Sequence, residues 1–301
     1  MLQKILNTLK DLTSTPDADQ SEQEPSQPIT QPLTEVGQIK NSYQLNVGQG
    51  QSVGRQREHN EDAFFTLTSM LAHNNSELPL GLYIVADGMG GHQNGEIASE
   101  LAIRSIVENI FEEIIAPLLS LNPQPRDSSF QEVFHNSIEK ANHEIVSNSY
   151  GGGTTVTAVL IIGEQMTIAH VGDSRVYAVD PEGGLDPLTR DHSLVKRLQE
   201  LGQITSEEAA VHPQRNVLYR ALGQGEPFEP EIISSRRPDE GHLLVCSDGL
   251  WSIVDDQLIS DIIINSPSPQ EAVDALINAA NEAGGPDNIS VILVKLPEPS
   301  A

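Results

Sequence analysis

Residues 82–91 read Leu-Tyr-Ile-Val-Ala-Asp-Gly-Met-Gly-Gly, and the fold can be worked out from this stretch outward. The apolar run 82–86 predicts a strand, and Asp87 with the glycines after it ends that strand. A carboxylate at a strand end lies at the rim of a sheet, where the backbone holds it rigidly and solvent still reaches it. The chain repeats this design at three more places, which are Val171-Gly172-Asp173, Val245-Cys246-Ser247-Asp248 and Gly285-Pro286-Asp287.

A further acidic cluster, Asn60-Glu61-Asp62, precedes the apolar run 63–65. One Asp-Gly pair alone is most often a turn, but several aspartates behind apolar strands point to a shared site. If Asp87, Asp248 and Asp287 converge, their charges repel one another, and divalent cations relieve that repulsion. Mg²⁺ and Mn²⁺ prefer oxygen ligands, so a few convergent aspartates are sufficient to hold them.

Short apolar runs elsewhere predict further strands at 155–162, 166–171, 176–179, 242–246 and 289–296. Gly163-Glu164 separates two of these runs by the length of a tight antiparallel hairpin, and the stretch 180–184 marks a looser one. Hairpins between neighbouring runs favour antiparallel sheets over a parallel, doubly wound sheet.

Helices are indicated by apolar stripes and by capping residues. One stripe consists of Ile97, Leu101, Ile106, Ile110 and Ile114. Ser128 with Gln131 predicts a capping box that begins a second helix. Ser268-Pro269 begins a third helix, and Gly284-Gly285 ends it. Together with the hairpins, these helices predict an α+β fold, a four-layer sandwich of two antiparallel β-sheets flanked by helices.

The composition of the 301 residues excludes several classes of function. Seventeen Lys and Arg against 43 Asp and Glu give a net charge of −26, which repels nucleic acids and anionic lipids. Cys246 is the single cysteine, so no intramolecular disulfide forms, as is typical of a reducing cytosol. No apolar run approaches the roughly 20 residues that span a bilayer. We therefore expect a cytoplasmic protein with no membrane span and no nucleic acid partner.

The first 45 residues differ from the rest of the chain. Apolar residues with helical spacing occupy a segment too short for a stable helix on its own; they are Leu2, Ile5, Leu6, Leu9 and Leu12. The stretch that follows is rich in Gln, Pro and Ser and poor in apolar residues, as in a disordered tail. We therefore predict an N-terminal tail over 1–45 and one folded catalytic domain over 46–297.

Eight motifs in a fixed order carry a resemblance to a known family. The chain resembles the metal-dependent protein serine/threonine phosphatases of type 2C, in their bacterial form, over about residues 46 to 296. The motifs are RxxNEDAF (57–64), VADGMGG (85–91), GGTTVTAVLI (152–161), AHVGDSRVY (169–177), LTRDHSLV (188–195), RNVLYRALG (215–223), LVCSDGLW (244–251) and GGPDNISVILV (284–294). The family fold, two antiparallel sheets between helices, agrees with the fold expected from the strands and helices above.

The resemblance implies a metal site built from the strand-end aspartates. It implies that Asp87 bridges two ions of Mn²⁺ or Mg²⁺, with the Gly88 carbonyl as a further ligand. Asp248 and Asp287 are the other implied ligands of that pair. Asp173 matches the ligand of a third, weaker ion, so we expect two or three ions.

The resemblance also implies how the reaction proceeds. Glu61 matches an acid that holds metal-bound water, and Arg57 matches the arginine that binds the substrate phosphate. Two cations that share a water lower its pKa, so a metal-bridging hydroxide attacks phosphorus directly and no covalent phosphoenzyme is needed. A bidentate Arg57 stabilises the charge that spreads onto the phosphate oxygens.

One residue departs from the pattern of many eukaryotic relatives. They have a histidine directly after the Asp-Gly pair, proposed to protonate the leaving alkoxide, and this chain has Met89, which cannot donate a proton. A metal-bound water or His92 is left for that role, and His92 is more simply a residue of the rim. The proton donor therefore stays open.

The expected function is hydrolysis of phosphoserine and phosphothreonine on proteins by a monomeric enzyme, with kinases and their substrates as partners. Two alternatives remain. One is a catalytically weak regulatory module of the same fold that binds phosphoproteins. The other is a stress-response phosphatase acting on anti-sigma-factor antagonists, although those relatives usually lack the mobile flap that this chain resembles over 189–223. A dinucleotide site at the glycines after Asp87 is excluded, because Gln93 stands where a third glycine is needed.

Overall fold

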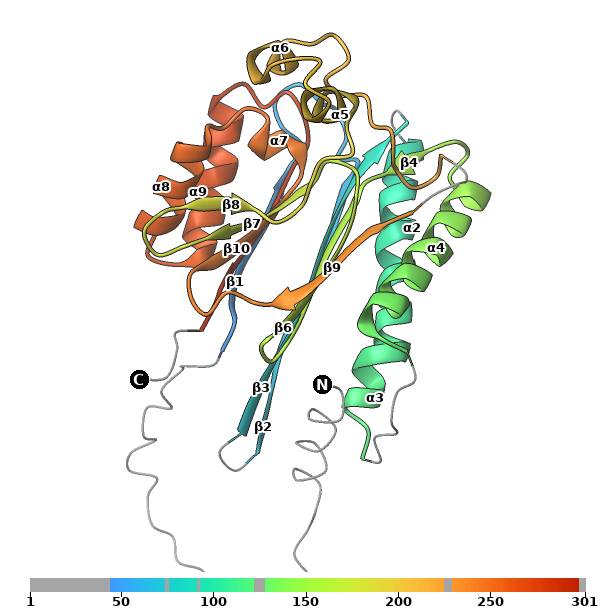
Figure 1. Cartoon of the computed structure of the whole chain (residues 1–301), viewed down its shortest axis with the longest axis vertical. Helices are drawn as coiled ribbons and strands as arrows, with labels where there is room; N and C mark the ends of the chain where they lie inside the picture. The colour runs from blue at the N-terminus through green and yellow to red at the C-terminus, as the bar shows by residue number, and fades with distance from the viewer. Residues whose placement is uncertain (1–43, 74–75, 91–92, 122–127, 225–228, 298–301) are drawn as a thin grey trace, which may run out of the picture.

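The computed structural model describes residues 44–73, 76–90, 93–121, 128–224 and 229–297. The predicted amphipathic segment and the Gln/Pro/Ser-rich stretch lie outside the described residues. Two antiparallel sheets pack face to face, and helices cover the outer surface of each (Figure 1). This arrangement confirms the predicted four-layer α+β sandwich.

The six-stranded sheet has the strand order β2-β3-β5-β6-β9, and β4 pairs with β3 at one end. Every pair in it is antiparallel. Its strands are β2 (Asp62–His73), β3 (Ser76–Met89), β4 (Gly153–Thr154), β5 (Val156–Ile162), β6 (Gln165–Val171) and β9 (Glu231–Arg236). The predicted tight hairpin at Gly163-Glu164 joins β5 to β6, as their register shows.

The five-stranded sheet has the order β1-β11-β10-β7-β8 and is also antiparallel. Its strands are β1 (Asn46–Ser52), β7 (Arg175–Val179), β8 (Leu185–Pro187), β10 (His242–Cys246) and β11 (Ile289–Lys295). The looser predicted hairpin joins β7 to β8, where the amide of Asp180 donates to the carbonyl of Gly184.

The strand 82–86 is apolar throughout because both of its faces are buried. Leu82 and Ile84 pack under the helices of one outer layer, whereas Tyr83 and Val85 pack between the two sheets. A strand covered on only one face would alternate apolar and polar residues.

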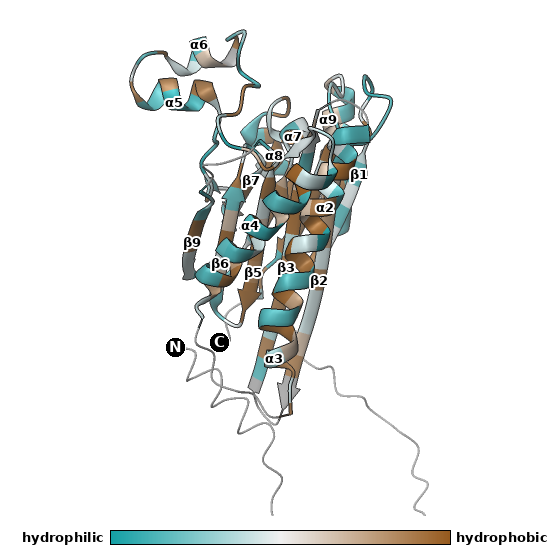
Figure 2. Cartoon of the chain, turned by 90° about the vertical axis from the view of Figure 1, so that its right-hand side faces the viewer, coloured by the Kyte–Doolittle hydropathy of each residue, from teal (hydrophilic) through white to brown (hydrophobic). Residues whose placement is uncertain are grey.

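Two helix pairs form the outer layers (Figure 1). Helices α2 (Gln93–Ile110) and α4 (Phe130–Asn148) cover the six-stranded sheet, and α8 (Asp256–Asn265) and α9 (Pro269–Glu282) cover the five-stranded sheet. The polar and apolar bands along α2 and α4 in Figure 2 fit helices with one buried side. After α2 the chain forms a π-helical turn (Phe111–Ile115) and the short α3 (Ala116–Leu118).

Two predictions about helix ends have different outcomes. Ser268 accepts a hydrogen bond from the amide of Glu271 and begins α9, as predicted. The capping box of α4 was predicted one residue too early: it joins Ser129 to Glu132, not Ser128 to Gln131. The carboxylate of Glu132 is a stronger acceptor for the cap amide than the neutral amide of Gln131, which favours the later register.

The segment predicted as a flap, 189–223, carries α5 (Leu194–Glu200) and α6 (Ser206–Ala210). A capping box between Thr205 and Glu208 begins α6. Figure 1 places both helices beyond one end of the sandwich, the end that also carries α7 (Asp248–Trp251). None of the helices in the described ranges is long and apolar enough to cross a membrane.

Candidate active site

Two aspartates, Asp62 buried and Asp87 half-buried, face each other where β2 begins and β3 ends. Asp62 and Asp87 are direct partners in the antiparallel register. Oδ2 of Asp62 accepts hydrogen bonds from the hydroxyls of Ser247 at 2.9 Å and Ser290 at 2.7 Å. Its other oxygen, Oδ1, is buried without a hydrogen-bond partner among the described residues. Burial outweighs the two hydroxyl bonds and raises the pKa of Asp62 to about 7.

Two threonines, the last residue of β4 and the residue after it, hold the backbone of Asp87 through hydrogen bonds. Its amide donates to Oγ1 of Thr155 at 3.0 Å, and its carbonyl accepts from Oγ1 of Thr154 at 2.9 Å. The side chain is therefore presented from a rigid strand end. Burial, followed by the charge of Asp62, raises the pKa of Asp87 well above the usual range of an aspartate.

Asp248 enters the site from the other sheet, as the first residue of α7 after β10 ends. Its Oδ1 is buried and has no hydrogen-bond partner in the part of the chain that the structure describes. Burial and then the charge of Asp287 raise the pKa of Asp248 to about 6, although a hydrogen bond with Asp87 acts in the opposite direction. Asp87 and Asp248 therefore come together across the two sheets.

Asp173 follows the end of β6 and turns toward the same place. Burial and then the charge of Asp248 raise its pKa well above the usual range. The indole of Trp251 donates to the carbonyl of Asp173 at 3.0 Å, so α7 also fixes the position of this aspartate. The guanidinium of Arg175 lies 3.5 Å above the Trp251 ring.

Arg57 and Asp287 form the exposed side of the site. Nη2 of Arg57 lies 2.7 Å from Oδ2 of Asp287. Asn288 anchors the loop that carries Arg57: its side-chain amide donates to the carbonyls of Val53 and His59, both at 2.9 Å, and its oxygen accepts from the amide of Glu61 at 2.8 Å. A single buried side chain thus ties residues 53–61 to the Asp287 turn.

Glu61 and Gly88 lie beside the aspartates. The amide of Gly88 donates to the Glu61 carbonyl at 3.2 Å. The Glu61 carboxylate lies against the first turn of α2, where a Cβ added to Gly95 would be 2.0 Å from Oε2. All seven residues that the sequence singled out are therefore at one end of the sandwich: Arg57, Glu61, Asp87, Gly88, Asp173, Asp248 and Asp287.

The donor set fits divalent cations. Burial and neighbouring carboxylates raise the pKa values of Asp62, Asp87, Asp173 and Asp248, and the guanidinium groups of Arg57 and Arg175 offset only part of that rise. The oxygens of Asp62 and Asp248 that have no partner among the described residues are available as acceptors. Among the described residues, no group of three or more His, Cys, Asp or Glu side chains is gathered closely enough to hold an ion by itself. Ions bound here would therefore keep water ligands, as Mg²⁺ commonly does.

Sequence reasoning placed Asp62 in an acidic cluster but assigned it no role, and it missed Asn288 and Arg175. Asp62 is recognisable only through its contacts with Ser247 and Ser290, which are distant in sequence. Arg175 forms a two-bond ion pair with Asp191 at the base of the flap, at 2.8 and 2.7 Å. His92, left as one option for the proton donor, lies outside the described residues.

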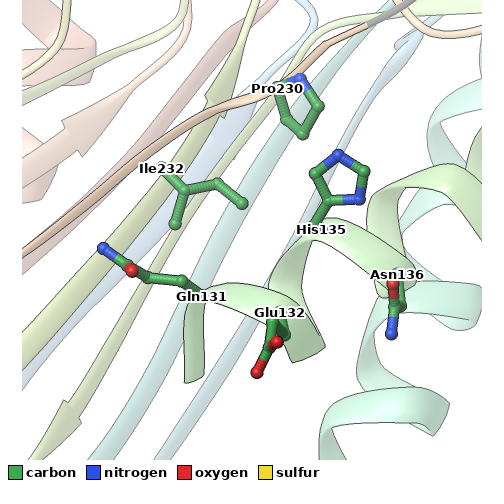
Figure 3. Close-up of a pocket in the computed structure, with 6 residues that line it drawn as sticks. All are labelled: Gln131, Glu132, His135, Asn136, Pro230 and Ile232. Carbon is green, nitrogen blue, oxygen red and sulfur yellow. The ribbon is translucent and has the colours of Figure 1, made fainter. Parts of the chain in front are cut away.

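A separate hollow of about 360 Å³ lies between α4 and β9. Figure 3 shows His135 beneath Pro230, with Ile232 and Gln131 beside them. It contains none of the seven site residues, so the chemistry expected of the aspartates does not involve it.

The protein phosphatase 2C family model matches residues 46–289. The chain belongs to the protein phosphatase 2C family. The match includes every motif that carried the resemblance except the end of the last one, so the predicted family is confirmed, and with it the expectation of a protein phosphatase.

The chain aligns with individual members of the phosphatase 2C family over nearly their whole length. The serine/threonine phosphatase Stp of Listeria welshimeri is 38% identical over 243 residues, which cover 80% of this chain and 92% of that protein. The S. agalactiae serine/threonine phosphatase has a structure that matches with a TM-score of 0.71 at 33% identity, covering 84% of this chain and 99% of that one. The catalytic domain of the phosphatase PstP, solved in complex with two manganese ions, matches with a TM-score of 0.67 at 30% identity, covering 85% and 99%.

Proposed function

We propose that this chain hydrolyses phosphoserine and phosphothreonine on proteins, with Mn²⁺ or Mg²⁺ as its cofactor, at the end of the sandwich where Asp87, Asp248, Asp287 and Arg57 meet. The observation that carries the proposal is the group of convergent aspartates, among them Asp87 and Asp248 with raised pKa values, beside a guanidinium. Carboxylates of this kind bind cations, and a guanidinium binds phosphate oxygens.

Each residue then has a defined part. Asp87, Asp248 and Asp287 hold two ions, with the Gly88 carbonyl as a further ligand. Asp173 is placed to hold a third ion beside Asp248. Divalent cations, when bound, neutralise these carboxylates and lower the pKa of water toward neutrality.

Three groups of this chain act around the ions. Glu61 accepts hydrogen bonds from water at the start of α2. Arg57 binds and orients the phosphate and stabilises the charge that develops on its oxygens. Asp62, held by two serine hydroxyls, keeps a second carboxylate beside Asp87. The two manganese ions of the PstP relative support the assignment of a two-ion centre.

The cellular setting follows from the same reasoning. We infer a cytoplasmic monomer that reverses the work of serine/threonine kinases, with phosphoproteins as its partners. The flap helices α5 and α6 favour this setting over the stress-response phosphatases that act on anti-sigma-factor antagonists. All the matching ligands are present, which argues against a catalytically weak regulatory module.

Hydrolysis of p-nitrophenyl phosphate and of a phosphothreonine peptide tests the proposal. We expect turnover of both with Mn²⁺, loss of both with a chelator, and a loss of several orders of magnitude in Asp248→Ala. Asp255→Ala is the matched control, because Asp255 caps the exposed start of α8. Appreciable turnover by Asp248→Ala after the metal has been stripped would overturn the assignment.

A further inference from the structure

Tyr150 has an unusual backbone and an unusual degree of exposure. Its φ is 53°, and it is the one residue other than glycine with a positive φ in the described ranges. The left-handed conformation is disfavoured for a bulky side chain. The residue is also 86% exposed. Both features are unfavourable in the free protein, and such outliers tend to persist where they serve a function.

The turn that holds Tyr150 is rigid. Helix α4 ends at Asn148, and the amide of Gly152 then donates to the carbonyl of Ser149 at 3.0 Å. The hydroxyl of Ser149 donates back to the carbonyl of Gly152 at 2.9 Å, and Asn94 donates to the carbonyl of Tyr150 at 3.3 Å. Glycine is the usual residue at this position after a helix. The fixed turn therefore presents an aromatic ring to solvent where glycine would be less strained.

The turn leads directly to the reaction centre. Gly153 pairs with Met89 and Thr154 pairs with Gly88 in the short β3–β4 ladder. Oγ1 of Thr154 donates to the carbonyl of Asp87. Tyr150 is four residues before Thr154, so its Cα lies at most about 14 Å from that contact. A substrate peptide that is extended over four residues also spans about 14 Å, so it can reach from the reaction centre to Tyr150.

The charge of the chain makes an apolar contact valuable here. The protein carries −26, and a phosphoprotein segment is anionic as well, so the two repel each other at long range. An aromatic ring adds attraction without adding charge, and rigid aromatic anchors often dominate the energy of a protein interface.

We propose that Tyr150 is a specificity-determining residue that packs against an apolar side chain of the substrate polypeptide, within about four residues of the phosphorylated serine or threonine. This inference rests on the proposed phosphatase function. It predicts that the enzyme prefers phosphopeptides with a large apolar residue such as leucine in that flank.

Two series of phosphothreonine peptides test this inference. They are identical except that one places leucine, and the other serine, at each flanking position in turn. For the unchanged protein we expect kcat/KM to be about fivefold higher with leucine than with serine at one or two of the positions. The gain should come from a lower KM. Tyr150→Gly should reduce this preference to less than about twofold, whereas Tyr150→Phe should retain it. Tyr150→Gly should also unfold at an equal or higher temperature, since glycine removes the strain.

Leu121→Ala is the matched control. Leu121 is 82% exposed and follows α3, which lies at the opposite end of the sandwich from the flap (Figure 1). This variant should keep the leucine preference. A preference that survives in Tyr150→Gly, or that is absent in the unchanged protein, overturns the inference and leaves the proposed function standing. No hydrolysis of any phosphopeptide or of p-nitrophenyl phosphate by the unchanged protein overturns both.

Discussion

Nη2 of Arg57 lies 2.7 Å from Oδ2 of Asp287, and this contact joins the two halves of the proposed chemistry. Arg57 is assigned to the phosphate and Asp287 to a metal ion. Their side chains are 49% and 29% exposed, so the ion pair contributes little to stability. The ion pair instead fixes a position, because it holds the guanidinium of Arg57 at the edge of the acidic cluster.

The first prediction concerns Arg57→Ala. Removal of the guanidinium should lower kcat/KM by roughly 10- to 100-fold, since a hydrogen bond from a charged donor contributes about 1.5–3 kcal/mol. Manganese affinity should hold or rise, because a cation that competes for Asp287 is gone. Steady-state kinetics and calorimetric titration of Mn²⁺ measure the two effects separately. A collapse of manganese affinity, with normal kcat/KM restored at saturating Mn²⁺, would show that Arg57 serves the metal site and not the substrate.

The second prediction concerns stability with metal. If Mn²⁺ binds only the folded protein, a concentration about 100 times Kd adds about 2.7 kcal/mol to the free energy of unfolding. For a domain of this size, that should raise Tm by roughly 5–10 °C. Chelation should reverse the rise, and Asp248→Ala should lose it. Thermal scans at several Mn²⁺ concentrations measure the shift, and an equal shift in Asp248→Ala would place the metal elsewhere.

The third prediction concerns Asp62 in the metal-free protein. Burial raises its pKa from 3.8 to about 7. Between these values the folded chain keeps a proton that the unfolded chain has lost, so the contribution of Asp62 to stability falls as pH rises through this window and is constant above it. Asp62→Asn removes that dependence and still offers an oxygen to Ser247 and Ser290.

Denaturation of the two metal-free proteins from pH 4 to 8 checks this third prediction. Asp62→Asn should gain stability relative to the unchanged chain as pH rises toward 7, by several degrees in Tm. Ser69→Ala, on the same strand far from the site, should leave the pH profile of the unchanged chain intact. If the difference between Asp62→Asn and the unchanged chain stays flat across the window, Asp62 titrates normally and its burial has been compensated.

Much of the fold could be predicted because its central strands are buried on both faces. The run 82–86 is apolar on both sides of the strand, which makes it easy to recognise. The strands β1 and β9 lie at sheet edges and escaped prediction, because their sequences, NVGQGQS and EIISSR, mix polar residues or glycine with few apolar ones. Edge strands need fewer apolar residues, so composition identifies them poorly.

Some features of the candidate site could be predicted from the sequence and others could not. Residues at strand ends, such as Asp87 and Asp248, follow a local pattern and could be singled out. Contacts between distant segments could not: Asp62 and Ser290 are 228 residues apart, and Arg57 and Asp287 are 230 apart. The capping box of α4 shows a third case, because Ser128 and Ser129 both begin a suitable motif and the hydrogen bonds of the folded chain select the second.

The last prediction concerns His192, which joins the base of the flap to the Asp173 turn. Burial lowers its pKa to about 3, so the ring is neutral. Its Nδ1 accepts from the amide of Gly172 at 3.1 Å, its own amide donates to the Gly172 carbonyl at 2.7 Å, and its carbonyl accepts from the amide of Tyr219 at 2.9 Å. Gly172 has a φ of 109°, and an added Cβ would lie 2.5 Å from Thr155, so its position cannot shift easily.

His192→Phe leaves the Gly172 amide buried without its acceptor and should cost about 1–3 kcal/mol in unfolding free energy. His192→Asn keeps an acceptor at the position of Nδ1 and should recover most of that loss. Hydrogen exchange at the Gly172 amide and protease cleavage within 189–223 should both be faster in His192→Phe than in His192→Asn. Both variants lose the contact of Nε2 with Glu231, found at 3.5 Å, so that contact does not contribute to the difference between them. Exchange at Gly172 that is equal in the two variants, or slower in His192→Phe, would mean that this bond does not hold the flap to the Asp173 turn.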